Sequence, residues 1–172
     1  MTVIRRETEG EAPLIHALHD AAFATAAHAA GYEADLVDAL RTGGDWVPEY
    51  SLVAEADGKP VGHVVSTYGR LNGERVLGLG PISVDPSLHG KGIGSALMHA
   101  AIAAADARDE PGIVLLGDPK FYGRFGFVPS TEFGVEAPEA AWGAYFQIRT
   151  LSAWRPELRG KYAYSPAFDE MG

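Results

Sequence analysis

The segment from Gly80 to Gly94, with the sequence GPISVDPSLHGKGIG, constrains the fold of this chain more than any other. It begins as an apolar, strand-like run and breaks at Asp85-Pro86. It then continues as a loop with three glycines in five residues, directly before a helix-forming stretch. Because glycines carry no side chain, the backbone N–H groups of such a loop can point at a phosphate group, and the positive end of the helix dipole adds to the attraction. The order of strand, turn, loop and helix therefore predicts an anion-binding site.

The composition of the chain limits the ligands and partners that such a site can bind. The 172 residues fit one domain, residues 1–172, and no linker or repeat divides them. A formal net charge of -9 disfavours binding to nucleic acid and favours small or cationic partners. The absence of cysteine excludes disulfides, thiolate zinc sites and a cysteine nucleophile. No stretch has the length and apolarity of a membrane span, and the first residues lack the apolar core of a signal peptide, so we expect a cytoplasmic protein with no membrane partner.

Apolar periodicity and turn residues predict the order of the elements. Leu14, Leu18 and Ala22 recur at helical spacing, and Asp57-Gly58 is a strong hairpin signal. The expected elements are a strand at 2–7, helices at 12–30 and 32–40, three antiparallel strands at 52–56, 61–68 and 75–84, a helix at 95–108, and a strand at 113–116. Because a helix of this length joins the last two strands, they should be parallel through a right-handed crossover. The fold class is therefore α/β with a mixed sheet.

The glycine-rich loop does not match the familiar nucleotide motifs. In a dinucleotide fingerprint that starts at Gly90, Ser95 stands where a third Gly or Ala is required. A Walker loop needs Ser or Thr after Gly-Lys, and the Gly-Lys pairs at 90–91 and 160–161 are followed by Gly and Tyr. These mismatches disfavour a nucleotide-binding protein. The loop then either binds another ligand with a phosphate group, or its glycines only form turns.

Two motifs resemble the GNAT superfamily of N-acetyltransferases. The run LHGKGIGSALM is similar to its acyl-CoA pyrophosphate loop, with Gly92 and Gly94 at the two small positions and His89 where Gln or Arg is usual. The run GDPKFYGRFGFVP, residues 117–129, is similar to the region where GNAT enzymes carry a Tyr four residues before a Gly-Phe pair; Tyr122 fits this pattern. Together with AYFQIRTL and YAYSPAF near the C-terminus, they look most like the YhbS-like subgroup.

The resemblance implies a GNAT-like fold in which an antiparallel meander is followed by a parallel crossover. The strands at 79–84 and 113–117 would splay into a V-shaped slot for acetyl-CoA, with no metal. The strand at 79–84 would pair with the pantetheine arm, and an N–H group near Ile82 or Ser83 would stabilise the thioester oxyanion. Gly80-Pro81 suits a local distortion there, since proline donates no ladder hydrogen bond. The expected acetyl-CoA contacts are Ile82, Ser83, Val84, His89, Gly90, Lys91, Gly92, Ile93, Gly94 and Ser95.

The resemblance also makes Tyr122 the acid that protonates the departing thiolate. A phenol with an ordinary pKa of about 10 is protonated at neutral pH and can donate a proton. The alternative is a packing tyrosine in an aromatic cluster with Phe121, Phe125 and Phe127. Both roles stay open on the sequence alone.

The base that takes the proton of the attacking amine is not determined by the sequence. A water chain could serve, and five side chains at element ends or on strands are candidates: Glu33, Asp35, His63, Asp85 and Asp118. We expect the acceptor side to be built from the first helices, the segment 43–50 and the tail after Phe127. The function expected is acetyl transfer from acetyl-CoA to a primary amine of a small molecule or peptide in a ternary complex. The alternative is a non-catalytic acyl-CoA-binding or sensory module, and a homodimer is left open.

Overall fold

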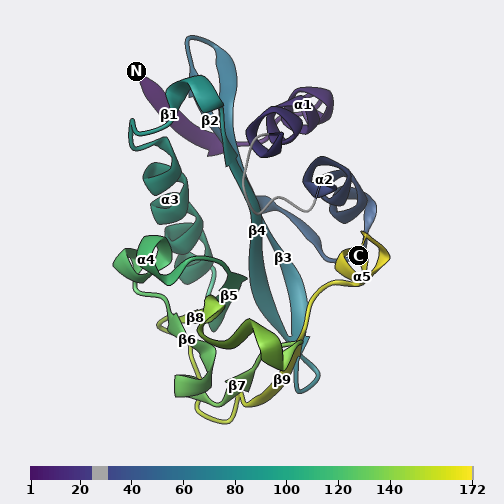
Figure 1. The fold of residues 1–172 in the computed structure, drawn as a ribbon, viewed down its shortest axis with the longest axis vertical. Coiled ribbons are helices and arrows are strands. Elements are labelled where there is room, and N and C mark those ends of the chain that lie inside the picture. The colour runs from purple at the N-terminus through teal and green to yellow at the C-terminus, as the bar shows by residue number, and fades with distance from the viewer. Residues whose placement is uncertain (25–30, 172) are drawn as a thin grey trace.

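The computed structural model describes residues 1–24 and 31–171 (Figure 1). Its helices are α1 (Ala12–Phe23), α2 (Glu33–Thr42), α3 (Ile93–Ala107), α4 (Pro119–Tyr122) and α5 (Pro166–Met171), with 3-10 turns η1 (Pro86–Leu88), η2 (Gly123–Phe125), η3 (Ser130–Phe133) and η4 (Ala140–Tyr145). Its strands are β1 (Thr2–Arg6), β2 (Trp46–Ala56), β3 (Lys59–Leu71), β4 (Glu74–Val84), β5 (Gly112–Leu116), β6 (Val128–Pro129), β7 (Val135–Glu136), β8 (Phe146–Thr150) and β9 (Gly160–Ala163).

The predicted meander is confirmed. Strands β2, β3 and β4 pair antiparallel in sequence order. The turns between them use Asp57-Gly58 and Asn72-Gly73, whose four residues all have positive φ, as a tight hairpin turn requires. Strand β2 begins at Trp46, so the prediction that it starts at residue 52 was wrong. Trp46 already pairs with Thr67, and the register shift that follows lies around Pro48, which donates no ladder hydrogen bond.

The parallel crossover and the V-shaped splay are also confirmed. Strand β5 pairs parallel with β4 through only two residue pairs, Leu77 with Ile113 and Gly78 with Val114. Beyond them, β4 passes through the cis Gly80-Pro81 bond and a register shift against β3. Its last residues stay paired with β3 and leave β5, which pairs antiparallel with β8 on its other edge. The sheet therefore opens between β4 and β5.

Helices cover both faces of the long strands. Figure 1 shows α3 and α4 on one side of β2 to β4, and α1, α2 and α5 on the other. Leu97 and Met98 of α3 are fully buried in the larger core. Ile15 of α1 and Val37 of α2 pack on Val53 of β2 from the opposite face.

The first predicted helix, 12–30, is α1, which ends at Phe23; residues 25–30 lie outside the described part of the chain. The face of α1 was predicted wrongly in one respect. Leu14 is 55% exposed, and Ile15, Leu18 and His19 are buried in its place. The helix therefore presents a face one residue further along the sequence toward the sheet.

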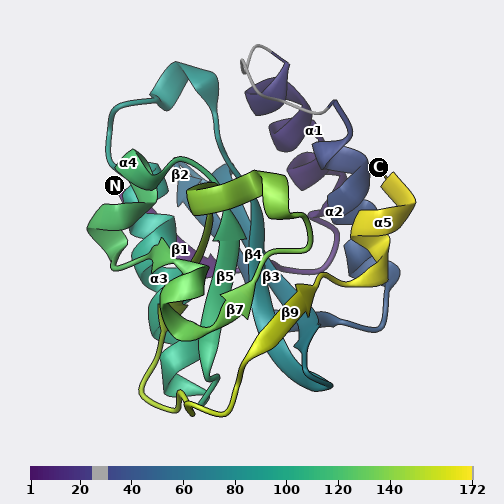
Figure 2. The same cartoon turned by 60° about the horizontal axis from the view of Figure 1, so that its bottom comes forward.

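The C-terminal segment returns to the sheet and closes one end of the molecule. Strand β9 pairs with the end of β3 and with β7, and the chain then runs to α5 beside α2 (Figure 2). Ala167 of α5 packs between Leu36 and Leu40 of α2. Within the described ranges, each helix is too short or too polar to cross a membrane.

Candidate active site

The glycine-rich loop has the geometry of an anion site. Gly90 and Gly92 adopt left-handed conformations, with φ of 79° and 82°, and Gly92 is the N-cap of α3. The first N–H group of α3 with an intrahelical acceptor is that of Ala96, which donates to the Gly92 carbonyl at 3.0 Å. The N–H groups of the three residues between them therefore have no intrahelical acceptor and are directed out of the helix N-terminus.

His89 and Lys91 take different positions in this loop. The His89 Nε2–H donates to the Val84 carbonyl at 3.1 Å, so this side chain ties the loop to the end of β4. Lys91 is exposed, and none of the ion pairs found among the described residues involves it.

A pocket of about 910 Å³ continues from the splay between β4 and β5 into a wider chamber. Its slot end is lined by Leu79, Gly80, Pro81 and Ile82 of β4 and by Leu115 and Leu116 of β5. Of the other predicted contacts on β4, Ser83 is buried with its hydroxyl unpaired and Val84 is half-buried. The chamber end is lined by Phe23, Tyr32, Glu33, Leu36, Pro138, Glu139, Trp142, Lys161, Tyr162, Ala163, Tyr164, Phe168 and Asp169.

Tyr122 lines this pocket and also belongs to an aromatic cluster. Its ring centroid lies 4.8 Å from that of Phe121 and 6.2 Å from that of Phe127, both in edge arrangements. Burial raises the pKa of Tyr122 to about 12, so its phenol keeps its proton at neutral pH. Packing in the aromatic cluster is therefore compatible with a position on the pocket wall, and the role of Tyr122 as the acid stays a prediction.

Gly117, the residue after β5, lies directly against the ring of Tyr122. Its N–H donates to the Tyr145 carbonyl at 2.9 Å, and its own carbonyl accepts from Gln147 Nε2 at 2.9 Å. The sequence analysis did not identify Gln147, because nothing in its local pattern distinguishes it from any other strand residue.

The five candidate bases occupy different environments. Glu33 lines the pocket, whereas the other four do not. Asp85 accepts from the Ser87 N–H and Asp118 from the Lys120 N–H, each at 2.9 Å, so both cap short helices. Asp35 is exposed and lies near His16 and Asp38 on the outer side of α1 and α2.

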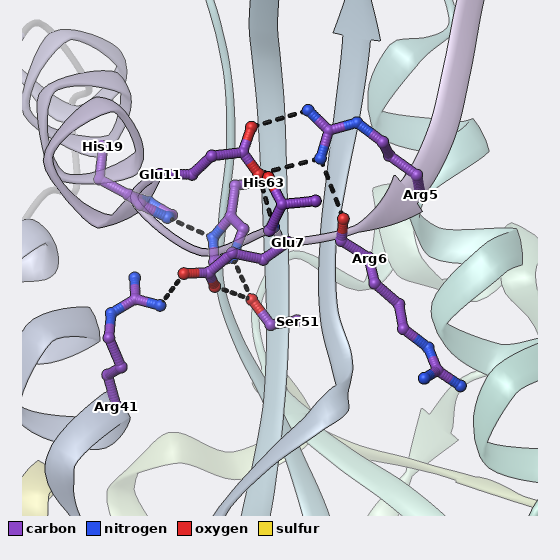
Figure 3. A network of polar contacts seen from close by, with 9 residues as sticks. Arg5, Arg6, Glu7, Glu11, His19, Arg41, Ser51 and His63 are labelled. Atoms are coloured by element: carbon purple, nitrogen blue, oxygen red, sulfur yellow. Dashed lines mark hydrogen bonds and ion pairs between the residues drawn. The ribbon is translucent and has the colours of Figure 1, made fainter.

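His63 is completely buried beneath α1 and takes part in a polar network (Figure 3). Its Nδ1 lies 2.8 Å from His19 Nε2 and its Nε2 lies 2.9 Å from Ser51 Oγ, which donates to Glu7. Glu7 also accepts from Arg41. Since the Ser51 hydroxyl donates to Glu7, Ser51 accepts from the His63 Nε2–H, and His63 Nδ1 accepts from His19. The expectation that His63 could face the slot as a base was therefore wrong.

The acceptor side was predicted in part. The first helices and the tail after Phe127 line the chamber, as expected. The segment 43–50 does not, because most of it is strand β2 and its first residues line a second pocket of about 570 Å³ instead. Trp142, Tyr164 and Phe168 form an aromatic wall that local sequence patterns do not reveal.

Comparisons with known proteins agree with this geometry. Residues 48–129 match the acetyltransferase (GNAT) domain family. The chain is 30% identical over 153 residues to the Escherichia coli (strain K12) protein named Uncharacterized N-acetyltransferase YhbS, covering 87% of each. The crystal structure of YhbS in complex with CoA covers 99% of this chain and 93% of that one, with 28% identity and a TM-score of 0.88.

A second solved structure is similar over its full length. The crystal structure of a GNAT family acetyltransferase from Brucella melitensis in complex with acetyl-CoA is 35% identical, with a TM-score of 0.81, over 98% of this chain and 99% of that one. The predicted resemblance and the predicted fold are both confirmed. This chain belongs to the GNAT family of acetyltransferases.

Proposed function

We propose that this protein is an enzyme that transfers an acetyl group from acetyl-CoA to a primary amine. The observation that carries the proposal is one pocket that is lined by both strands of the open slot, by Tyr122 and by the residues of the chamber. Two similar structures hold acetyl-CoA and CoA, which supports the choice of donor. A single domain over residues 1–172 and a place in the cytoplasm remain predictions that accompany this function.

The donor would be held at two places. The pyrophosphate would accept hydrogen bonds from backbone N–H groups between His89 and Ser95, where the dipole of α3 favours negative charge. The amides of the pantetheine arm would pair with the edge of β4 at Ile82, Ser83 and Val84, which β5 leaves free. A free N–H group on this edge would stabilise the oxyanion that forms on the thioester carbonyl.

The reaction proceeds by direct attack within a ternary complex. The amine nitrogen bonds to the thioester carbon, and the carbon–sulfur bond then breaks to release the CoA thiolate. Tyr122 gives its proton to the sulfur, which its raised pKa permits because the phenol stays protonated at neutral pH. Glu33, the candidate base on the pocket wall, takes the proton lost by the amine nitrogen, directly or through water.

The experiment that tests this function measures CoA thiol release from acetyl-CoA in the presence of diverse primary amines, with mass spectrometry of the acetylated product. Amine-dependent thiol release with a matching acetylated product is the expected result. Tight binding of acetyl-CoA without thiol release above the hydrolysis rate, for any amine, would replace the enzyme with the acyl-CoA-binding or sensory module. A calorimetric titration with acetyl-CoA distinguishes this outcome from an inactive preparation.

A further inference from the structure

The chamber end of the pocket carries more negative than positive charge. Glu33 from the start of α2, Glu139 from the residue before η4 and Asp169 from α5 line it, and Lys161 is the one cation on its wall among the residues that the structure describes. Glu33 accepts hydrogen bonds from the Gly31 N–H at 3.0 and 3.1 Å. Within residues 1–24 and 31–171, neither the Glu139 nor the Asp169 carboxylate has an ion-pair partner or a side-chain hydrogen bond. Carboxylates from three separate segments thus face one cavity with little intramolecular compensation.

The same chamber has an aromatic wall. The ring centroids of Tyr164 and Phe168 lie 4.6 Å apart, and those of Trp142 and Tyr164 lie 6.4 Å apart. Burial raises the pKa of the Tyr164 phenol, which keeps it neutral, and its hydroxyl donates no hydrogen bond to any described residue. Aromatic faces next to carboxylates bind organic cations, because the ring quadrupole and the carboxylate charge attract the same group.

The aromatic wall begins where the slot begins. A Cβ atom on Gly78 would lie 2.9 Å from Tyr164 Cε1, so the Tyr164 ring rests against the last β4 residue that pairs with β5. A ligand that reached the thioester in the slot would therefore pass along this wall. The wall and the three carboxylates belong to the path of the acceptor.

The charge of this chamber does not suit the nitrogen that reacts. That nitrogen must lose its proton before it attacks, and one carboxylate, that of Glu33, is enough to take it. The further carboxylates of Glu139 and Asp169 would raise the pKa of the same ammonium group and so oppose the loss. The carboxylates favour binding only if they act on a different group, one that remains charged through the reaction. An alkyl ammonium group with a pKa of about 10 is such a group.

We infer that the acceptor is an aliphatic diamine or polyamine, whose reacting amine enters the slot while a second ammonium group binds between Glu139, Asp169 and the aromatic wall. This inference rests on the proposed function and adds the class of acceptor. Of the described chamber residues, Lys161 is the one that would instead favour an acceptor with a carboxylate, such as an amino acid.

Three acceptors of matched chain length separate these cases: putrescine with two ammonium groups, butylamine with one, and γ-aminobutyrate with a carboxylate in place of the second. With saturating acetyl-CoA, we expect kcat/KM to be highest for putrescine, by about tenfold over butylamine, and lowest for γ-aminobutyrate. Added salt should reduce the advantage of putrescine, because it screens charge pairs at the open end of the chamber. Equal kcat/KM values for putrescine and butylamine, or preference for γ-aminobutyrate, would overturn the inference and leave the enzyme intact.

If the protein acetylates none of these acceptors, their binding can still be measured and still tests the inference. Calorimetric titration of the same three compounds into the protein saturated with CoA should give the same order of affinity. Selective binding of putrescine without thiol release would remove the proposed transfer and keep the dication site. Absence of putrescine binding and of putrescine turnover would remove the dication site.

Substitutions of the chamber carboxylates test whether these residues recognise the second ammonium group. The double change Glu139→Gln and Asp169→Asn should lower kcat/KM for putrescine by about tenfold and leave that for butylamine nearly unchanged. Glu132→Gln is the matched control, because Glu132 is an exposed carboxylate of the neighbouring turn η3 that does not line the pocket. An equal loss for putrescine and butylamine in the double variant would contradict recognition of the second charge.

Discussion

Gly117 lies directly against the ring of Tyr122: a Cβ atom added to residue 117 would come within 2.3 Å of Tyr122 Cε2. Carbon atoms that are not bonded do not approach so closely, because their optimal separation is about 3.5 to 4 Å. The missing side chain at position 117 therefore sets the depth at which the phenol sits beside the slot. This contact leads to a prediction about catalysis that needs no change to the phenol itself.

Gly117→Ala should displace the Tyr122 ring and lower kcat by about tenfold or more, because proton transfer depends on the position of the acid. The affinity for acetyl-CoA should change little, because the proposed phosphate and pantetheine contacts come from the backbone of the glycine-rich loop and of β4, which this substitution leaves unchanged. Gly123→Ala, one residue after Tyr122, is the control: an added Cβ meets no atom within 4 Å, and its φ of -56° suits alanine. Steady-state kinetics and acetyl-CoA titrations of both variants provide the check, and equal kcat values would refute the contact as a determinant of activity.

Tyr122→Phe should lower kcat about a hundredfold, the effect expected when a general acid is removed, with acetyl-CoA affinity nearly intact. Because the pKa of Tyr122 is raised to about 12, the wild-type protein should show no loss of kcat from ionisation of this phenol up to about pH 10. Tyr145→Phe removes the hydroxyl of a tyrosine that is 55% exposed and serves as the matched control. Undiminished kcat in Tyr122→Phe would leave Tyr122 with its packing role alone.

The parts of the site that could be predicted from the sequence have local signals. The glycine-rich loop, the start of α3 and Tyr122 are read from residues close together in the chain, where glycine spacing and turn residues determine the backbone. The extension of β2 could not be read in this way. Trp46 becomes a strand residue because it pairs with Thr67, and a pairing across a long sequence separation leaves no local pattern.

The chamber and the burial of His63 could not be predicted from the sequence for the same reason. Glu139, Trp142 and Tyr164 meet only after β9 pairs with β3 and β7, which brings the irregular tail over the end of the sheet. For His63, strand alternation indicates two faces but not which face α1 will cover. Long-range packing decides both questions, so neither could be settled by the composition or spacing of nearby residues.

Glu33→Gln should lower kcat/KM for the acceptor at neutral pH, because a glutamine cannot take the proton of the amine. The defect should shrink as pH rises toward the acceptor pKa of about 10, since a growing fraction of the amine is then already deprotonated. Asp35→Asn changes an exposed carboxylate on the same helix that does not line the pocket and should behave as wild type. Rate profiles over pH for the three proteins make this measurement, and a constant defect in Glu33→Gln at all pH values would exclude Glu33 as the base.

The buried pair His19 and His63 should make the protein less stable in mild acid. Burial lowers the pKa of His19 from 6.5 to about 3, and that of His63 falls well below 6.5 for the same reason, with Arg41 acting in the same direction on both. Below pH 6.5 the unfolded chain therefore binds more protons than the folded one. The stabilisation that neutral histidines provide is complete above pH 6.5 and is lost as pH falls, at about 1.4 kcal/mol per pH unit for each histidine.

Two other groups bound the range in which this effect can be measured. The ion pair with Arg5 lowers the pKa of Glu11 from 4.5 to about 2, so the stability that Glu11 provides is lost only below pH 4.5. Asp38 raises the pKa of His16, so the stability that protonation of His16 provides is complete below pH 6.5 and is lost only as pH rises above it. The slope between pH 6.5 and 4.5 therefore reports on the buried pair.

The check is the free energy of unfolding in urea at several pH values across that range. His63→Gln should reduce the slope by about half, because one of the two suppressed protonations is removed, and should also lower stability at neutral pH by breaking the contact with His19. His99→Gln changes an exposed histidine, whose ring lies edge-on to Phe125, and should preserve the slope. If the slope is the same in His63→Gln as in the parent protein, the buried pair is not its origin, and the protonation states assigned to the network beneath α1 are incorrect.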